Sequence, residues 1–231
     1  MLQHKTGVAL LTVCVLLLTA SLAQAQQSLN IQLGVFMPRG EGGRSAGDVL
    51  VTNRQYLFFN LDDFNGFTGG GEWLVAAGKN LEVGIGAAYY QRTVPSVYEG
   101  WVNTDGSEIS QEMSLRVAPV VATLKYLPLG ARSTFQPYVG IGLAVYFWHY
   151  SETGDFVDFS DNSIYSAAYV ASGTSVGPVA TFGVRARVSA RADAGIEMRA
   201  QWGQGNLSND FLGNKIDLGG VNVLGTFRLR F

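Results

Sequence analysis

A period of two in hydrophobicity, repeated in eight segments, is the feature that most constrains the fold of this chain. The segments are SLNIQLGVF (28–36), FTGGGEWLVA (67–76), LEVGIGAAYYQR (81–92), MSLRVAPVVATLKYL (113–127), PYVGIGLAVYFWHY (137–150), GPVATFGVRARVS (177–189), ADAGIEMRAQWG (192–203) and DLGGVNVLGTFRLRF (217–231). Alternating side chains project from opposite faces of a strand. Strands of soluble domains have about five or six residues. Segments of about 10 to 15 residues instead suit tilted strands that cross a membrane.

The connections between these segments alternate between short and long. The short ones are AAGKN (76–80), PLGARSTF (128–135) and SARA (189–192), and the long polar ones are 38–65, 93–112, 151–175 and 203–215. Outer-membrane barrels combine short periplasmic turns with longer external loops, and an even strand number places both termini on the periplasmic side. We therefore predict an all-β fold, an eight-stranded antiparallel transmembrane up-and-down β-barrel. The segment VLVTNRQYLFF (49–59) leaves ten strands as an alternative.

The N-terminus predicts export. His4 and Lys5 precede the apolar run GVALLTVCVLLLTASLA (7–23), which leads into an A-x-A sequence ending at Ala25. This is the pattern of a secretory signal peptide. An N-terminal membrane anchor is the alternative, disfavoured by the short run and the small-residue cleavage site. We expect a signal peptide over 1–25, cleaved near Ala25, and one barrel domain over 26–231.

Composition limits the partners of the exported part. Acidic residues outnumber basic ones there, so a nucleic-acid partner is not expected. The single cysteine, Cys14, lies in the leader, so residues 26–231 cannot form a disulfide. No apolar run after the leader approaches the roughly 18 residues of a spanning helix. Contact with a membrane must therefore be made by strands.

One face of the predicted strands is apolar and the other carries charges and glycines. A soluble barrel such as a lipocalin would bury the apolar face, whereas a membrane barrel turns it toward lipid. Arginines matched with acids suit buried bidentate pairing, and aromatic residues near the segment ends suit two interfacial girdles. The predicted girdle residues are Tyr89, Tyr90, Tyr126, Tyr138, Tyr146, Phe147, Trp148, Trp202 and Phe231. We therefore predict a lumen charge network. Its members are Glu72, Glu82, Arg92, Arg116, Lys125, Arg185, Arg187, Asp193, Glu197, Arg199, Arg228 and Arg230.

The fourth segment changes its apolar parity at Pro119. Leu115 and Val117 share one parity before it, and Val120 and Leu124 share the other after it. A β-bulge at Ala118–Pro119 would restore one apolar face, and proline is tolerated at bulges. We predict such a bulge.

The chain resembles the small outer-membrane barrels of the OmpA/OmpX/OmpW group. The residues that carry the resemblance are VAPVVATLKYLPLG (117–130), FQPYVGIGLAVYF (135–147) and the terminal FRLRF (227–231). The resemblance implies a bacterial outer-membrane location and contact with membrane lipid and lipopolysaccharide. It also implies that the barrel assembly machinery recognises Phe227, Leu229 and Phe231 as an assembly signal.

One motif raises the question of catalysis. His149 and Ser151 have a spacing similar to that of lipid A deacylases of the PagL type, in which an imidazole activates a serine and a carboxylate orients the imidazole. That family has Asn after the serine, whereas this chain has Glu152. Only loop acids remain as partners, namely Asp155, Asp158 and Asp161. A place for His149 in an aromatic girdle is the simpler interpretation.

The acidic segment SETGDFVDFSDN (151–162) offers oxygen ligands for calcium, but its spacing is irregular. A solvated loop, or divalent bridging to lipopolysaccharide phosphates, is the alternative. We predict no resident metal or cofactor.

The lumen charges allow two functions. A packed network would close an eight-stranded barrel, since its interior is just wide enough for side chains. An excess of arginine could instead line a narrow pore for anions or small solutes. We predict a non-enzymatic outer-membrane protein with a structural or surface-interaction role through four long external loops. The channel is the alternative, and lipid A deacylation is a remote one. The sequence does not specify the external ligand.

Overall fold

The structure, a computed structural model, describes residues 26–231. The predicted signal peptide and its cleavage site near Ala25 lie outside these residues.

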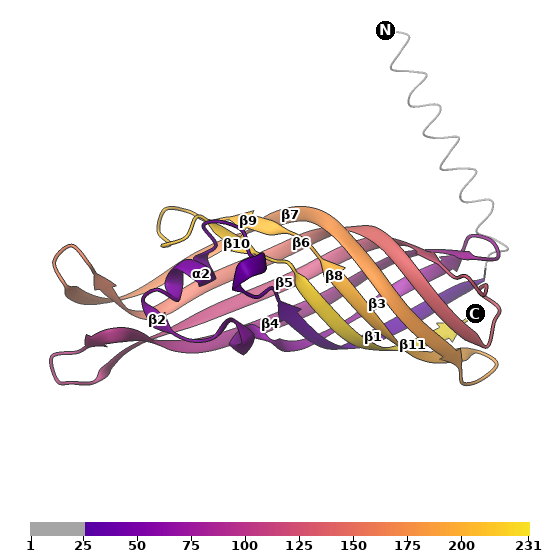
Figure 1. The fold of residues 1–231 in the computed structure, drawn as a ribbon, viewed down its shortest axis with the longest axis horizontal. Helices are drawn as coiled ribbons and strands as arrows, with labels where there is room; N and C mark the ends of the chain where they lie inside the picture. Colours follow the sequence, from indigo (N-terminus) through magenta and orange to yellow (C-terminus); the bar gives the residue numbers. More distant parts are fainter. Residues whose placement is uncertain (1–25) are drawn as a thin grey trace, which may run out of the picture.

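Eight antiparallel strands form a closed ring (Figure 1). They are β1 (Gln27–Pro38), β3 (Gly66–Ala76), β4 (Leu81–Val102), β5 (Glu108–Tyr126), β6 (Phe135–Asp158), β7 (Ser163–Arg187), β8 (Ala192–Gln201) and β11 (Gly220–Arg230). Each strand pairs with its neighbours in the ring, and β1 closes it by pairing with both β3 and β11. A closed ring leaves no unpaired edge, as any sheet in lipid requires. The predicted eight-stranded up-and-down barrel is confirmed.

The first long loop contains short elements and no further barrel strand. These are two 3₁₀ turns, η1 (Glu41–Gly43) and η2 (Leu61–Phe64), the helix α2 (Val49–Asn53) and β2 (Leu57–Phe58). Asp48 caps α2 by accepting hydrogen bonds from the amides of Leu50 and Val51 at 3.1 and 3.3 Å. The two residues of β2 pair only with β4. The ten-stranded alternative is therefore wrong.

Two of the predicted long loops are mostly strand. The β4–β5 and β6–β7 hairpins continue far beyond the ends expected from the sequence. Residues 93–97 pair with 110–114, Val102 pairs with Glu108 after a register shift, and 151–158 pair with 163–170. We call the following set the loop extension: residues 91–115 and 149–172, with the connections 39–65 and 203–219. The last connection contains the small hairpin of β9 (Gln204–Asn206) and β10 (Lys215–Asp217). The opposite end of the barrel, where the short turns and both ends of the barrel domain lie (Figure 1), is the turn end.

The predicted bulge at Pro119 is absent. The register between β5 and β6 runs without a shift from Gln111 opposite Gly154 to Tyr126 opposite Val139. Pairing with β4 lapses opposite Ala118 and Pro119 and then resumes in the same register. The parity of the strand is therefore constant, and the chemistry of its inward residues changes along its length. Thr123 and Lys125 point inward toward the turn end, and Leu115 and Val117 point inward toward the loop extension.

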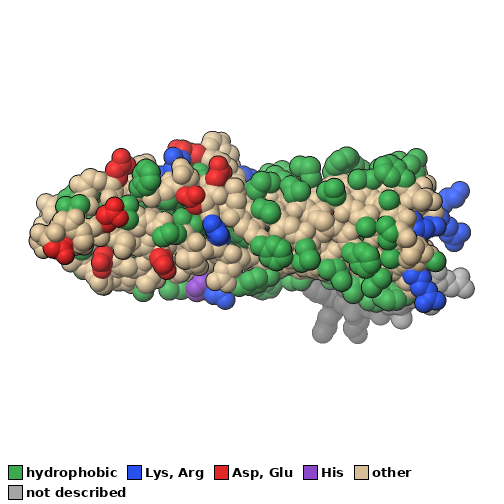
Figure 2. Space-filling view, turned by 90° about the horizontal axis from the view of Figure 1, so that it is seen from below, with side chains coloured by type: hydrophobic (Ala, Val, Ile, Leu, Met, Phe, Trp, Pro, Cys, Tyr) green, Lys and Arg blue, Asp and Glu red, His purple; other side chains and the backbone are tan. Residues whose placement is uncertain are grey.

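The exterior has two zones (Figure 2). The half toward the turn end is covered by exposed apolar side chains, including Ile85, Ile141, Leu143, Phe182 and Ile196. Acidic side chains are scattered over the loop extension, and basic ones gather at the tip of the turn end. Ile141 is 69% exposed, which would be unfavourable in water and suits a lipid-facing wall. No helix within residues 26–231 is long and apolar enough to cross a membrane.

The aromatic residues near the strand ends divide between the two faces. Tyr89, Tyr126, Phe147, Trp202 and Phe231 are exposed on the wall, as girdle residues should be. Their predicted companions Tyr90, Tyr138, Tyr146 and Trp148 are buried inside the barrel, so the prediction that they belong to a girdle is wrong. Adjacent residues of a strand face opposite sides, and clusters such as Tyr89-Tyr90 must split.

Candidate functional site

The interior next to the turn end holds a cluster of ion pairs that we call the lower ion layer. Glu82 on β4 accepts hydrogen bonds from Arg185 on β7 and, at 2.7 Å, from Arg228 on β11. Asp193 on β8 accepts from Arg228 Nε at 2.6 Å and lies 2.9 Å from Arg230 Nη2. All five side chains are buried. Four strands are thus linked across the lumen by charge-assisted bonds.

A second cluster, the upper ion layer, lies further along the axis. Lys125 Nζ is 2.6 Å from Glu72 Oε2 and 2.9 Å from Glu197 Oε2. Arg199 Nη2 donates to Glu197 Oε1 at 2.7 Å and to Gln32 Oε1 at 2.9 Å. Gln32 in turn donates to Glu72 at 3.2 Å, so the contacts of this layer form a closed ring.

Tyr138 separates the two layers. Its hydroxyl donates to Glu197 Oε2 at 3.0 Å, and its ring centroid is 5.2 Å from Lys125 Nζ and 5.1 Å from Arg185 Cζ. Cations at such distances are attracted to the ring face. A Cβ at Gly183 would lie 2.4 Å from the tyrosine ring, so this position needs glycine for the ring to fit. The lumen is filled between the layers as well as within them.

Most of the predicted lumen residues lie in these two layers, but Arg92, Arg116 and Arg187 do not. Arg116 is exposed on the outer wall, because the strand keeps its parity at Pro119. Arg92 is exposed beyond the end of β3, where its Nε donates to the carbonyl of Asp63 at 2.8 Å. The prediction for both is wrong. Arg187 is half-buried at the rim of the turn end and donates to the carbonyl of Arg132 at 2.9 Å.

The uncharged members of the network were missed. Gln32, Gln136 and Tyr138 each bond to a charged partner inside the barrel. The predicted lumen network contains charged residues alone. The alternation of the first segment does place Gln32 on the polar face, so the parity of each strand was the signal that could have identified such residues.

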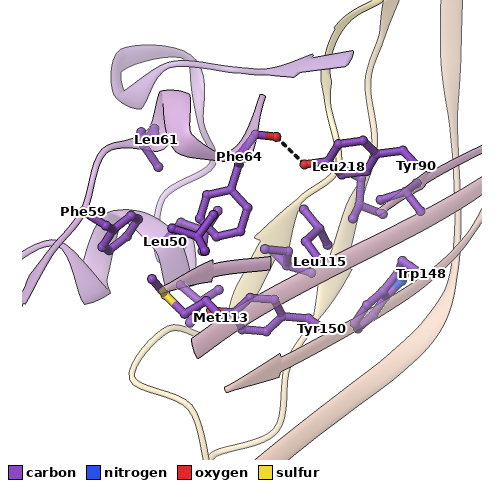
Figure 3. Packing of buried hydrophobic residues seen from close by; sticks show 14 of the residues in the cluster. Leu50, Phe59, Leu61, Phe64, Tyr90, Met113, Leu115, Trp148, Tyr150 and Leu218 are labelled. Atoms are coloured by element: carbon purple, nitrogen blue, oxygen red, sulfur yellow. Dashed lines mark hydrogen bonds between the residues drawn. The ribbon is translucent and has the colours of Figure 1, made fainter. Parts of the chain in front are cut away.

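Above the ion layers the interior becomes an apolar core (Figure 3). Leu50 and Phe64 from the first loop pack over inward side chains of the barrel, which include Leu115, Trp148 and Tyr150. The hydroxyl of Tyr90 donates to the carbonyl of Phe64 and ties the loop to β4. Between the core and the upper ion layer lies a cavity of about 20 Å³, room for about one water molecule.

One carboxylate in the loop extension is buried without a cation. Glu152 on β6 is 4% exposed, and its Oε1 accepts hydrogen bonds from the Tyr150 hydroxyl at 2.7 Å and from Asn53 Nδ2 at 2.6 Å. Within the described chain it forms no ion pair. Burial raises the pKa of Glu152, and the two hydrogen bonds offset only part of this effect.

This raised pKa has a consequence for stability. Between the ordinary pKa of a glutamate and the raised value, the folded state holds one more proton than the unfolded state, so stability falls as the pH rises through that window. We expect Glu152→Gln to be more stable than the wild type at neutral pH, with the difference disappearing in acid. Chemical unfolding in detergent micelles at both pH values, followed by tryptophan fluorescence, measures it. A pH-independent difference would contradict the assignment.

The residues considered for catalysis do not form a triad. Ser166, Ser160 and Ser163 donate hydrogen bonds to Asp155, Asp158 and Asp161, respectively. Among residues 26–231 no carboxylate is hydrogen-bonded to His149, which lies opposite Arg116 on β5 and Ser172 on β7. No group of three histidine, cysteine or acidic side chains within the same residues is placed to hold a metal ion.

Comparison with known proteins agrees with this architecture at the level of the fold. No family model and no curated protein matches the sequence. Among solved structures, Neisserial surface protein A is 12% identical with a TM-score of 0.50, over 89% of this chain and 97% of that one. The N-terminal β-barrel domain of Pseudomonas aeruginosa OprF is 10% identical with a TM-score of 0.43, over 90% of this chain and 100% of that one.

The similarity to Neisserial surface protein A shows the fold, and the physical features of the wall agree with it. A closed barrel with an apolar belt outside and ion pairs inside is an integral outer-membrane β-barrel. The fold is that of the small outer-membrane barrels, as the resemblance to the OmpA/OmpX/OmpW group implied. In barrels of this class the short turns face the periplasm and the long loops face outward.

Proposed function

We propose that the protein is a closed, non-enzymatic outer-membrane barrel that acts through its loop extension, in surface interaction or envelope structure. The observation that supports the proposal best is the filling of the interior by two ion layers and an apolar core, with a cavity of only about 20 Å³ between them. An ion would have to displace several buried charge pairs in order to pass. The same filling makes a channel the weaker alternative.

The loop extension has the rigidity and charge of an interaction surface. Its two long hairpins are paired almost to their tips, and its apolar core fixes the first loop against them. Acidic residues are exposed over it, among them Asp62, Glu99, Asp105, Glu108 and Asp158. A negative surface favours cationic partners.

Three contacts with the envelope belong to the same proposal. The apolar belt contacts membrane lipid, and lipopolysaccharide phosphates bind to exposed basic residues above the belt, with Arg92 and Arg116 as candidates. The third partner is the barrel assembly machinery, through Phe227, Leu229 and Phe231. All three side chains are exposed on the outer wall.

Single-channel recording in planar lipid bilayers tests the closed interior. We expect purified, folded protein to give no steady openings, because the ion layers bridge opposite walls of the lumen. Heat-modifiable mobility on gels checks that the inserted protein is folded. Steady anion-selective openings that Arg185→Glu abolishes would instead establish the channel.

A further inference from the structure

A cavity of about 90 Å³ lies inside the loop extension, apart from the ion layers. Its floor is formed by buried polar residues from three elements, Asn53 on α2, Gln111 on β5 and Glu152 on β6. Its rim includes the exposed Phe159, Tyr165, Asp210 and Leu212. The pocket is therefore enclosed at the base and reaches the extracellular surface.

The floor presents acceptor oxygens that nothing in the protein satisfies. Asn53 and Gln111 are only 1% and 3% exposed, yet their side-chain oxygens, Asn53 Oδ1 and Gln111 Oε1, have no hydrogen-bond partner. The amide of Asn53 is oriented by its donation from Nδ2 to Glu152 Oε1, which leaves Oδ1 as the free acceptor. Both hydrogen bonds to Glu152 use Oε1, so Oε2 is available as well.

A buried acceptor without a hydrogen bond lowers the stability of the folded state, and a buried carboxylate without a cation lowers it further. Native structures keep such groups where a ligand or ordered water completes them. The missing component must donate hydrogen bonds, and a positive charge would compensate Glu152. The floor offers a single carboxylate, Glu152, and the rim one more, Asp210, which is too few for a calcium site.

Aromatic side chains form the walls of the pocket. On one side Phe159 packs against Tyr56 with 4.8 Å between ring centroids, and on the other Phe156 packs against Tyr169 with a separation of 5.0 Å. Aromatic faces attract cations and are common around ammonium ligands. The acidic surface outside the pocket would raise the local concentration of cations.

We propose that this pocket binds a primary ammonium group, such as one end of a polyamine or a lysine side chain. Such a group has three N–H donors and no acceptor. They match the three available acceptors, namely Glu152 Oε2, Gln111 Oε1 and Asn53 Oδ1. A quaternary ammonium would fill the aromatic walls but would leave these oxygens unsatisfied. The site deepens the surface-interaction role proposed above and rests on it.

The test uses the folded protein, labelled with ¹⁵N, in detergent micelles. Butylammonium chloride is titrated while NMR follows the side-chain amides of Asn53 and Gln111, and sodium chloride at equal ionic strength serves as the reference. We expect saturable shifts that sodium does not produce. Glu152→Gln should raise the Kd at least about tenfold, because it removes the compensating charge. Tetramethylammonium should bind at least about tenfold more weakly than butylammonium.

Two variants keep the result interpretable. Glu112→Gln changes an exposed carboxylate of the same extension and should leave the Kd unchanged. Gln111→Met retains the volume of the side chain but loses the acceptor, and should weaken binding while the charge of Glu152 is kept. Spermidine and Nα-acetyl-lysine amide, titrated separately, distinguish a polyamine from a lysine side chain as the source.

Three results would overturn the proposal. They are shifts no different from those with sodium, a Kd that neither Glu152→Gln nor Gln111→Met changes, and tetramethylammonium binding as tight as that of butylammonium. The first would mean that the pocket holds only water. Bilayer conductance is independent of these measurements, so this proposal and that of a closed barrel can fail separately.

Discussion

Replacing Glu82 with glutamine is expected to destabilise the barrel by about 3–5 kcal/mol, the usual cost of removing one partner from a buried ion pair. Glu82 bonds to both Arg185 and Arg228 through its two oxygens. In the variant, Asp193 is the remaining carboxylate of the lower ion layer, and it already serves Arg228 and Arg230. A glutamine has nearly the same shape, so the loss would come from the uncompensated charge of the arginines rather than from a cavity.

Equilibrium unfolding by urea in detergent micelles, followed by tryptophan fluorescence, measures this effect. The matched control is Glu112→Gln, the same chemical change at an exposed position, which should alter the free energy of unfolding by less than about 0.5 kcal/mol. Equal midpoints for the two variants would show that the lower ion layer does not stabilise the barrel. The interpretation requires reversible two-state unfolding, which coincident fluorescence and circular dichroism transitions would establish.

The topology of the barrel followed from the sequence because period-two alternation and loop lengths are local signals. Each strand of the ring overlaps a segment of alternating residues, and the four long connections lie at one end. The length of the two long hairpins could not be predicted from the sequence. Residues 93–112 and 151–175 lack a long apolar row, and their pairing depends on partners across the hairpin and on the loop core.

The alternation of residues along a strand does not reveal whether its outer face contacts lipid or water. This explains why the bulge predicted at Pro119 is wrong. The inward residues of β5 change from Thr123 and Lys125 to Leu115 and Val117 where the surroundings change from lipid to water. The sequence shows this change as a shift of the apolar parity, which a bulge would also produce. Because of the same ambiguity, Arg116 was predicted to face the lumen, whereas it lies on the outer wall. This ambiguity does not affect the prediction for charged residues within the lipid-facing half, such as Lys125 and Glu197.

The pocket around Glu152 could not have been predicted from local patterns. Its floor joins residues from the first loop and from two hairpins, so the sequence separations are large: Asn53 and Glu152 are 99 residues apart. The sequence predicts Glu152 only as an acid of a loop that offers ligands for calcium, and as the residue that departs from the deacylase pattern. Its burial results from the packing of the loop extension, in which Tyr150 and Phe211 contact each other with 5.6 Å between ring centroids.

Deleting Phe231 is expected to remove most of the protein from the outer membrane while leaving the stability of purified, refolded protein nearly unchanged. The side chain is 71% exposed, and it stacks on Trp73 with 5.8 Å between ring centroids. One exposed aromatic pair contributes about 0.5–1.5 kcal/mol, and the deletion also removes the hydrogen bond from the Phe231 amide to the Gln27 carbonyl at 3.0 Å, worth about 0.5–1.5 kcal/mol. The pairing of β11 with β1 from Gly220 to Arg230 remains. A large loss in cells would therefore report recognition during assembly rather than folding energy.

The measurement compares the heat-modifiable form in outer-membrane fractions with urea unfolding of the same variant refolded in micelles. Phe135→Ala is the matched control, since Phe135 is also an exposed aromatic near the turn end but lies on β6, outside β11. We expect the control to reach the membrane at wild-type levels. Loss of both variants to the same degree would indicate that the lower aromatic girdle acts through membrane anchoring. Equal loss in cells and in micelles would show that Phe231 is structural, because a recognition signal acts only where the assembly machinery is present.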